Sequence, residues 1–490
     1  MLKRIFIYIL VCTLSIISQV YAQKSGKVIS AAERLELDGK FREASKLLQI
    51  QLSEHGSTIS TESREALEFE IERLRRVRLD YSLTESELYL SLKQNITRLA
   101  HKEFKRWISE RRFDDRIIDD TLRFVNTSVS NLFFRYPELN KRRVPPVDKS
   151  TFHRRLLETC LAIEKAAEKN GAPYVLPKKF QMTMTLTVDS SAITSGDTLR
   201  AWLPIPRLFP YQKDFVLDSA KPKPTYIANQ NSPIRSIYFQ QIAAETAPLF
   251  FMIKYTYKTF GVHFDLNPDS VKPYNKSNPI FAKYTAEGPN IVFTKKIRRL
   301  SDRICGKTTN PLLKAKKIYN WISMSIKYSF AREYSTIGNI SDYCLSKRYG
   351  DCGQEALLFI TLCRYNGIPA RWQSGWFTFP VNQNIHDWTE IFIEPYGWIP
   401  VDPYMGILAT QYMNDLTKAE QKNIRDFYFG GLDQYRMAAN SDNNQVLTPS
   451  KKYFRSDNVD FQRGEVESNR ENIYFNLFKY NLKVEEIDNR

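Results

Sequence analysis

The spacing of hydrophobic positions changes along the chain, and each change predicts a different kind of structure. From residue 27 to about residue 145, apolar residues recur every three or four positions, which is typical of amphipathic helices. From Met182 to Val188 the period shortens to two, with methionine, leucine and valine alternating with threonine. Such alternation predicts a strand with one buried face. We therefore expect a helical N-terminal region at residues 23–177, followed by an antiparallel β domain at residues 178–265.

The helical period returns near residue 290 and then mixes with strands. Asn310 and Pro311 predict a helix start, because asparagine caps helices and proline suits the first helical position. A second helix is expected at 354–365, and it is followed by three apolar stretches with strand character at 372–379, 385–394 and 398–401. The pattern predicts an α+β domain at residues 290–412 and a C-terminal extension with strands at residues 413–490.

Residues 1–22 have the layout of a secretory signal peptide. Two basic residues precede an uncharged apolar stretch from Ile5 to Val20, and a cleavage motif ends at Ala22. A short N-terminal membrane anchor is the alternative that this pattern leaves open. We expect an extracytoplasmic protein, periplasmic or secreted, with no stable membrane insertion after the signal is removed.

Charge and composition narrow the classes of partner. The 490 residues contain 71 Lys and Arg against 54 Asp and Glu, a formal net charge of +17. A basic surplus favours anionic partners in general. Because an exported protein rarely meets nucleic acid, we expect no nucleic-acid partner and interpret the surplus as affinity for anionic envelope material or as ordinary solubility. The 13% aromatic content supplies enough core to exclude wholesale disorder.

The cysteines do not form the pattern of a disulfide scaffold or a zinc site. Removing the signal leaves an odd number of thiols, so at least one is free or pairs between chains. They contain no CxxC pair, and no HxxxH pair occurs, so we expect no metal and no cofactor. The five remaining cysteines are Cys160, Cys305, Cys344, Cys352 and Cys363.

Cys352 is the leading candidate for chemistry. It follows Gly350 and Asp351 at the start of a predicted helix. A thiol in a first turn faces unpaired N–H groups and the positive end of the helix dipole, which favour the thiolate. The same N–H groups could hold an oxyanion. The alternative is a small buried side chain, which is how we interpret Cys363.

A nucleophilic cysteine needs a base and a group that orients the base. His386 is the histidine that follows Cys352 in the chain, and Asp402 ends the next predicted strand. A hairpin would place His386 and Asp402 near the same end, two or three residues from directly opposite, so a bulge or stagger must close the gap. The alternative is that these are three scattered structural residues.

Four short motifs together resemble the transglutaminase-like superfamily. They are Gly350-Asp351-Cys352-Gly353-Gln354, Arg364-Tyr365-Asn366-Gly367-Ile368-Pro369-Ala370-Arg371, His386-Asp387-Trp388-Thr389-Glu390 and Gly397-Trp398-Ile399-Pro400-Val401-Asp402-Pro403. The resemblance implies a papain-like core in which Cys352 is the nucleophile, His386 the base and Asp402 its orienter. Residues 198–206 resemble the β-sandwich-like domain that precedes this core in bacterial members.

Asp387 departs from the family pattern, which commonly has a small residue between the histidine and the tryptophan. Strand alternation points Asp387 away from His386, so we do not expect it to replace Asp402. The second oxyanion donor stays open among Trp321, Tyr328 and Tyr334.

The resemblance predicts thiol-dependent acyl transfer. A cysteine peptidase or amidase acting on peptide or carboxamide bonds is the favoured form, with a peptide or protein substrate that includes cell-envelope material. A protein-glutamine transglutaminase is the first alternative, because acceptor choice depends on the cleft. A non-catalytic envelope binding protein on the same fold is the second.

Overall fold

A computed structural model of the chain describes residues 26–55, 59–243 and 249–487. The predicted signal peptide lies outside the described residues. Within them, no helix combines the length and the apolar character needed to cross a membrane. The chain divides into two compact units, residues 1–147 and 148–490.

The first unit is helical, as the 3.6-residue period predicts, with one small sheet. Apolar side chains from its helices form two separate clusters, one around Phe41 and Leu74 and the other around Phe104 and Trp107. The predicted capping box at Thr84 and Glu87 starts one helix. The helices are α2 (Phe41–His55), α3 (Thr61–Asp80), α4 (Glu85–Asn95), α5 (His101–Ser109) and α6 (Ser128–Arg135), and the sheet has the order β1 (Leu83–Thr84), β3 (Thr121–Phe124), β2 (Asp115–Ile118).

The second unit begins with helix α7 (Ser150–Asn170), which was predicted as the last helix of the N-terminal region. It packs instead on the following β domain, where a Cβ on Gly261 would lie 2.7 Å from Ile163 Cγ1. A side chain at Gly261 would therefore push the helix off the sheet. The boundary between the units falls before α7, at residue 148 rather than at residue 178.

The β domain consists of two antiparallel sheets that share one apolar core. The alternating residues predicted to face inward, from Met182 to Val188, are buried in this core. One sheet has the order β15 (Gly431–Leu432), β9 (Phe250–His263), β4 (Tyr174–Val188), β19 (Phe478–Ile487), with β6 (Gln212–Lys221) on β9. The other has the order β18 (Asn472–Ile473), β17 (Glu465–Glu467), β5 (Thr198–Pro204), β8 (Ser236–Ile242), β7 (Tyr226–Ile227).

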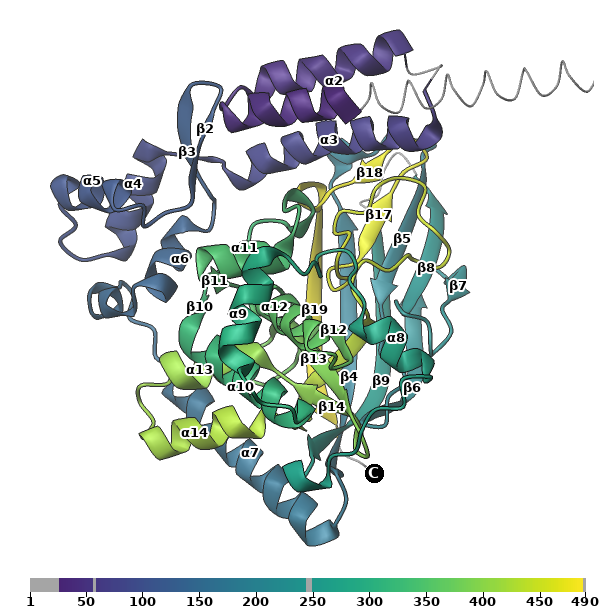
Figure 1. Ribbon diagram of the computed structural model, residues 1–490. Helices are drawn as coiled ribbons and strands as arrows, with labels where there is room; N and C mark the ends of the chain where they lie inside the picture. The colour runs from purple at the N-terminus through teal and green to yellow at the C-terminus, as the bar shows by residue number, and fades with distance from the viewer. Residues whose placement is uncertain (1–25, 56–58, 244–248, 488–490) are drawn as a thin grey trace, which may run out of the picture. The chain divides into compact units, whose positions relative to one another are not determined.

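Strands from the C-terminal segment complete both sheets. β19 pairs with β4 over ten residues, and β17 pairs with β5. In Figure 1 the yellow strand β17 lies beside the teal β5, and β18 pairs with the other edge of β17. The segment at 413–490 is therefore interleaved with the β domain rather than appended after the α+β domain.

The α+β domain surrounds a four-stranded antiparallel sheet with helices, which Figure 1 shows gathered beside β12 and β13. Its sheet has the order β14 (Gly397–Val401), β13 (Asn384–Ile393), β12 (Ala370–Phe377), β16 (Arg436–Ser441). Its helices are α8 (Pro279–Thr285), α9 (Lys295–Cys305), α10 (Pro311–Ser325), α11 (Ile340–Lys347), α12 (Cys352–Tyr365), α13 (Pro403–Gln411) and α14 (Lys418–Phe427). The α+β class is confirmed, and β16 comes from beyond the predicted domain end.

Gly375 allows β16 to join this sheet. It pairs with His386 on one side and Ala438 on the other, at a register shift in β12. A Cβ at this position would lie 1.8 Å from the backbone oxygen of Met437. Strand β16 can therefore come this close to β12 only because residue 375 has no side chain.

We predict that Gly375→Ala destabilises the protein by about 2–3 kcal/mol, because the clash is with backbone and cannot be relieved by a rotamer change. Urea unfolding followed by circular dichroism measures the loss. Gly338→Ala is the matched control, since nothing lies within 4 Å of a Cβ at that position. Equal stability of the two variants would contradict the assignment.

Candidate active site

Cys352 is the first residue of α12 and lies in a cleft of about 170 Å³. The preceding Asp351 caps the helix by accepting a hydrogen bond from the Gln354 N–H at 3.0 Å. The other described cysteines, Cys160, Cys305, Cys344 and Cys363, are buried, whereas Cys352 is partly exposed. Cys352 is therefore the thiol that a substrate can reach.

The cleft is built from four separate segments of the second unit. One wall is the loop at 328–334 and another is the start of β13, including Ile385 and Asp387. The C-terminal segment supplies a further wall through Asp457, Asp460, Gln462 and Arg463. This contribution was missed by the sequence analysis, because residues 457–463 lie about 100 positions after Cys352 and carry no periodic signal.

His386 and Asp402 are brought together as predicted from the hairpin. The register pairs Thr389 with Val401, so Asp402 lies just past the last pair and caps α13 through the Met405 N–H. The diagonal gap is closed by the side chains, since His386 Nε2 lies 2.7 Å from Asp402 Oδ2. His386 is 3% exposed and Asp402 is fully buried.

Arg436 extends this pair into a buried network. Its Nη1 donates to Asp402 Oδ2 at 2.9 Å, and its Nη2 donates to Asp433 Oδ2 at 2.8 Å. The Tyr428 hydroxyl donates to the same Asp433 oxygen at 2.8 Å. Because Arg436 is fully buried, its positive charge balances carboxylates that no water reaches. Sequence reasoning gave no sign of this residue.

The network fixes the charge states of the two groups. Burial lowers the pKa of His386 below its usual value, although the Asp402 carboxylate acts in the opposite direction. Burial alone would raise the pKa of Asp402, but His386 and Arg436 together hold it below its usual value. At neutral pH the arrangement is a neutral imidazole beside an ionised carboxylate, which is the state that a general base requires.

Asp387, and not His386, is the hydrogen-bond partner of Cys352. The thiol donates to Asp387 Oδ2 at 3.5 Å, and Gln462 Nε2 donates to the other oxygen at 2.7 Å. In the part of the chain that the structure describes, no hydrogen bond joins Cys352 to His386. The structure thus brings His386 and Asp402 together as predicted, but the Cys352 thiol is hydrogen-bonded to Asp387 instead of to His386.

The expectation of a thiolate at the helix start is wrong for this geometry. Burial raises the pKa of Cys352 well above its usual value, and the carboxylates of Asp387 and Asp351 act in the same direction. The Gln354 N–H, which would favour the thiolate, is already bonded to Asp351. Cys352 is therefore protonated at neutral pH in this arrangement.

The three residues considered as second oxyanion donors lie in different places. Tyr328 and Tyr334 line the cleft, whereas Trp321 does not and lies against the Arg348 guanidinium instead. The Tyr334 hydroxyl donates to Asp351 at 2.6 Å. The hydroxyl hydrogen of Tyr334 is therefore used to hold Asp351, the N-cap residue of α12.

Glu355, interpreted from sequence as an ordinary acid of the first helical turn, is fully buried. Among the described residues, neither of its carboxyl oxygens has a hydrogen-bond partner. Burial raises its pKa well above the usual value, helped by the charges of Asp351 and Asp402. Glu355 is accordingly neutral beneath the site.

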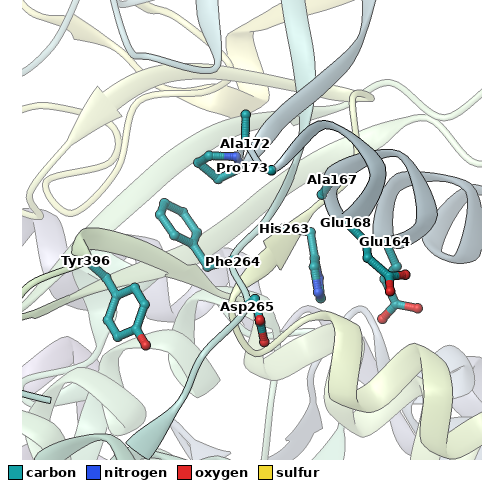
Figure 2. A pocket seen from close by; sticks show the side chains of 10 residues that line it. Glu164, Ala167, Glu168, Ala172, Pro173, His263, Phe264, Asp265 and Tyr396 are labelled. Atoms are coloured by element: carbon teal, nitrogen blue, oxygen red, sulfur yellow. The ribbon is translucent and has the colours of Figure 1, made fainter. Parts of the chain in front are cut away.

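A second cavity, of about 610 Å³, lies where the end of α7 approaches the end of β9 (Figure 2). His263 and the carboxylates of Glu164, Glu168 and Asp265 line it, and burial lowers the pKa of His263. Its described lining contains no cysteine, serine, threonine or lysine. Nor does any cluster in the described residues have the three or more His, Cys, Asp or Glu ligands of a metal site.

We predict that Arg436→Met lowers the free energy of unfolding by about 3–5 kcal/mol, because Asp402 and Asp433 would then be buried without their counter-charge. Chemical denaturation at neutral pH measures the change. Arg154→Met, which removes an exposed partner of Glu420, should leave stability nearly unchanged. A small effect of Arg436→Met would show that the network does not hold Asp402.

Glu355 makes a prediction about pH. Its pKa is raised in the folded state, so the folded protein binds a proton that the unfolded chain releases above about 4.5. Stability should therefore fall as pH rises from there towards the folded pKa, by about 1.4 kcal/mol per pH unit for this group. Glu355→Gln should be more stable than the wild type at pH 7.5, with the difference shrinking towards pH 5.

Urea titrations at several pH values test this expectation. Glu471→Gln, which alters an exposed side chain, controls for the change in net charge. A Glu355→Gln variant with the wild-type pH profile would mean that the carboxyl is ionised in the fold.

Comparison with known proteins agrees with the geometry. Residues 298–403 match the model of the transglutaminase-like superfamily, a range that contains Cys352, His386 and Asp402. An uncharacterised protein from Haemophilus influenzae is 26% identical over 172 residues, which are 29% of this chain and 43% of that protein. The match therefore spans less than half the length of this curated relative.

Two solved structures are similar at low identity. A candidate cysteine protease from Cytophaga hutchinsonii is 16% identical, with a TM-score of 0.42, covering 65% of this chain and 93% of the other. The periplasmic domain of TgpA from Pseudomonas aeruginosa is 15% identical, with a TM-score of 0.25, covering 55% and 95%. On the family match, the segment at residues 298–403, with its helix-borne cysteine and its His–Asp pair, belongs to the transglutaminase-like superfamily.

Proposed function

We propose that this protein is a cysteine-dependent hydrolase, a peptidase or amidase, in which Cys352 is the nucleophile, His386 the base and Asp402 its orienter. The observation that carries the proposal is the buried 2.7 Å pair of His386 and Asp402 next to a cleft that exposes one cysteine. His386 directly precedes Asp387, whose carboxyl is the hydrogen-bond partner of the Cys352 thiol. The combination is what acyl transfer requires.

The hydrogen bond between His386 and Asp402 determines which ring nitrogen of His386 can accept a proton in the proposed reaction. Because His386 Nε2 donates to Asp402, the proton-accepting lone pair of the ring is on Nδ1. The proposal requires the Cys352 thiol to turn from Asp387 towards this nitrogen when substrate fills the cleft. Catalytic hydrogen bonds that are absent without substrate commonly form in the substrate complex.

Proton and bond changes then follow in order. His386 accepts the thiol proton as the sulfur bonds to the carbonyl carbon, and the imidazolium is stabilised by Asp402. Breakdown of the tetrahedral intermediate breaks the C–N bond, and His386 returns the proton to the leaving amine. A water molecule, deprotonated by His386, releases the acid from the thioester and restores the thiol.

The charge of the cleft favours water over an amine as acceptor. Burial raises the pKa of both Asp387 and Asp460, but an amine is the stronger base. An amine that enters beside them would take up a proton and pair with the carboxylate left behind, and its ammonium form has no lone pair with which to attack. Hydrolysis is therefore proposed ahead of glutamine cross-linking. Substrates are proposed to be peptides or proteins, including cell-envelope peptides, and the extracytoplasmic location rests on the signal-peptide pattern of residues 1–22.

One observation favours a different class of function. The thiol is protonated and bonded to Asp387 instead of to His386, which is also what a non-catalytic envelope binding protein on this fold would show. The intact His386–Asp402 pair weighs against this alternative. Direct assay of turnover separates the two.

We predict that Cys352→Ala abolishes hydrolysis across a wide library of peptides and amides while leaving the fold intact. His386→Ala should lower kcat/KM by a similar factor, at least about 1,000-fold, and Asp402→Asn by less than His386→Ala. Cys305→Ala is the matched control, because Cys305 is outside the cleft. Circular dichroism verifies that each variant is folded, and mass spectrometry of the products with and without a primary amine identifies the acceptor.

Turnover that survives in Cys352→Ala would reject the nucleophile assignment. A complete absence of turnover in the wild type, with Cys352 still reactive towards alkylating reagents, would support the binding function instead. Amine adducts in excess of free acid would assign the protein as a transferase.

A further inference from the structure

Acidic side chains outnumber basic ones around the cleft of Cys352, whereas basic residues outnumber acidic ones in the protein as a whole. Five acidic and two basic side chains line the cleft, whereas the full chain has 54 acidic and 71 basic residues. The acidic side chains are Glu333, Asp351, Asp387, Asp457 and Asp460, and the basic ones are Arg332 and Arg463. An acidic cleft in a basic protein favours a positively charged ligand at this one place.

Three of the five acidic side chains form hydrogen bonds or ion pairs that stabilise the protein itself. Glu333 forms a two-point ion pair with Arg463, at 3.1 and 2.7 Å. Asp351 caps α12 and accepts from the Tyr334 hydroxyl. Asp457 accepts two backbone N–H groups, at 2.8 and 3.2 Å. These contacts explain the three residues without a ligand, and the Glu333 pair also neutralises Arg463.

Asp460 has no such explanation. Its side chain lines the cleft, and the residue is 6% exposed. Within residues 26–55, 59–243 and 249–487 its carboxylate has no hydrogen-bond or ion-pair partner. Arg463 and Arg455 favour its ionised form only from a distance, and burial outweighs them, so the pKa of Asp460 is raised. A buried carboxyl at a cavity wall without a hydrogen-bond partner is costly unless a ligand supplies the missing contact.

We propose that Asp460 binds a cationic group of the substrate, so that the enzyme selects acyl donors with an amine or guanidinium next to the scissile carbonyl. This proposal rests on the proposed function, because it concerns the substrate of the same cleft. Asp387, bonded to the Cys352 thiol, marks where the carbonyl must approach. Asp460 and Asp387 line the same cleft, so the two positions belong to one subsite.

The size of the cleft fits one side chain. Its volume of about 170 Å³ is below the 300–1,000 Å³ that is typical of sites for whole small molecules. It is sufficient for the end of a lysine-like or arginine-like side chain. A bound cation would also let Asp460 ionise, which burial and its acidic neighbours Asp457 and Asp387 oppose in the empty cleft.

The first experiment measures charge selection at Cys352 without requiring turnover. The probes are three methanethiosulfonates, which carry a 2-aminoethyl, a methyl or a 2-sulfonatoethyl group and are therefore cationic, neutral and anionic. Each rate of Cys352 modification is divided by the rate for the same reagent with free 2-mercaptoethanol. We expect the cationic reagent to be favoured over the neutral one by about tenfold and the anionic reagent to be disfavoured.

Variants assign the selection to Asp460. Asp460→Asn should reduce the cation preference several-fold, Asp460→Glu should retain it, and Asp269→Asn, which removes an exposed charge outside the cleft, should leave it unchanged. If Asp460→Asn does not fold, the salt dependence of the wild type replaces it, since a charge-based preference falls between 0.02 and about 0.5 M salt. An equal preference in the wild type and Asp460→Asn, or one insensitive to salt, overturns the proposal.

The second experiment compares turnover of paired substrates that contain lysine or its neutral isostere norleucine. We expect kcat/KM to favour the lysine substrate over the norleucine substrate in the wild type, and the ratio of the two values to approach one in Asp460→Asn. Turnover without a lysine preference would reject the subsite and leave the hydrolase intact. Cation-selective modification without any turnover would reject the hydrolase and retain the subsite.

Discussion

The buried contact between Arg436 and Asp402 is the interaction on which the site depends. Asp402 can orient His386 only while it is ionised, and burial opposes its ionisation. Arg436 supplies the compensating charge from the first residue of β16. Three strands must therefore end at the same edge of the sheet in a fixed register, because a shift of one residue would turn these side chains to the other face.

At Cys352, the proposed nucleophile, burial favours the neutral form and no neighbouring charge reverses its effect. The two arginines that line the cleft do not offset burial and the acidic groups of Asp387 and Asp351, so the Cys352 thiol stays protonated and donates its hydrogen bond to Asp387. The side chains of His386, Asp402 and Arg436 are already held in place by hydrogen bonds, whereas the Cys352 thiol is neutral.

Local patterns were enough to predict the secondary structure near the site and part of its geometry. The cap at Asn310, the helix at Cys352 and the two-residue offset between His386 and Asp402 follow from neighbouring residues, and the structure has all three. Arg436 and Asp460 could not be predicted, because each reaches the site through long-range strand pairing. β19, for example, pairs with a strand about 300 residues earlier. The thiolate expectation failed for the same reason, since the burial of Cys352 depends on walls that arrive from elsewhere.

The C-terminal segment therefore has two connected roles. β16 delivers the arginine that charges the base–carboxylate pair, and the loop that follows delivers the carboxylate and amide groups of the cleft wall. Both lie after residue 403, where the family match ends. Because β17 and β19 anchor this segment in the β domain, the neighbouring domain fixes the shape and charge of the cleft.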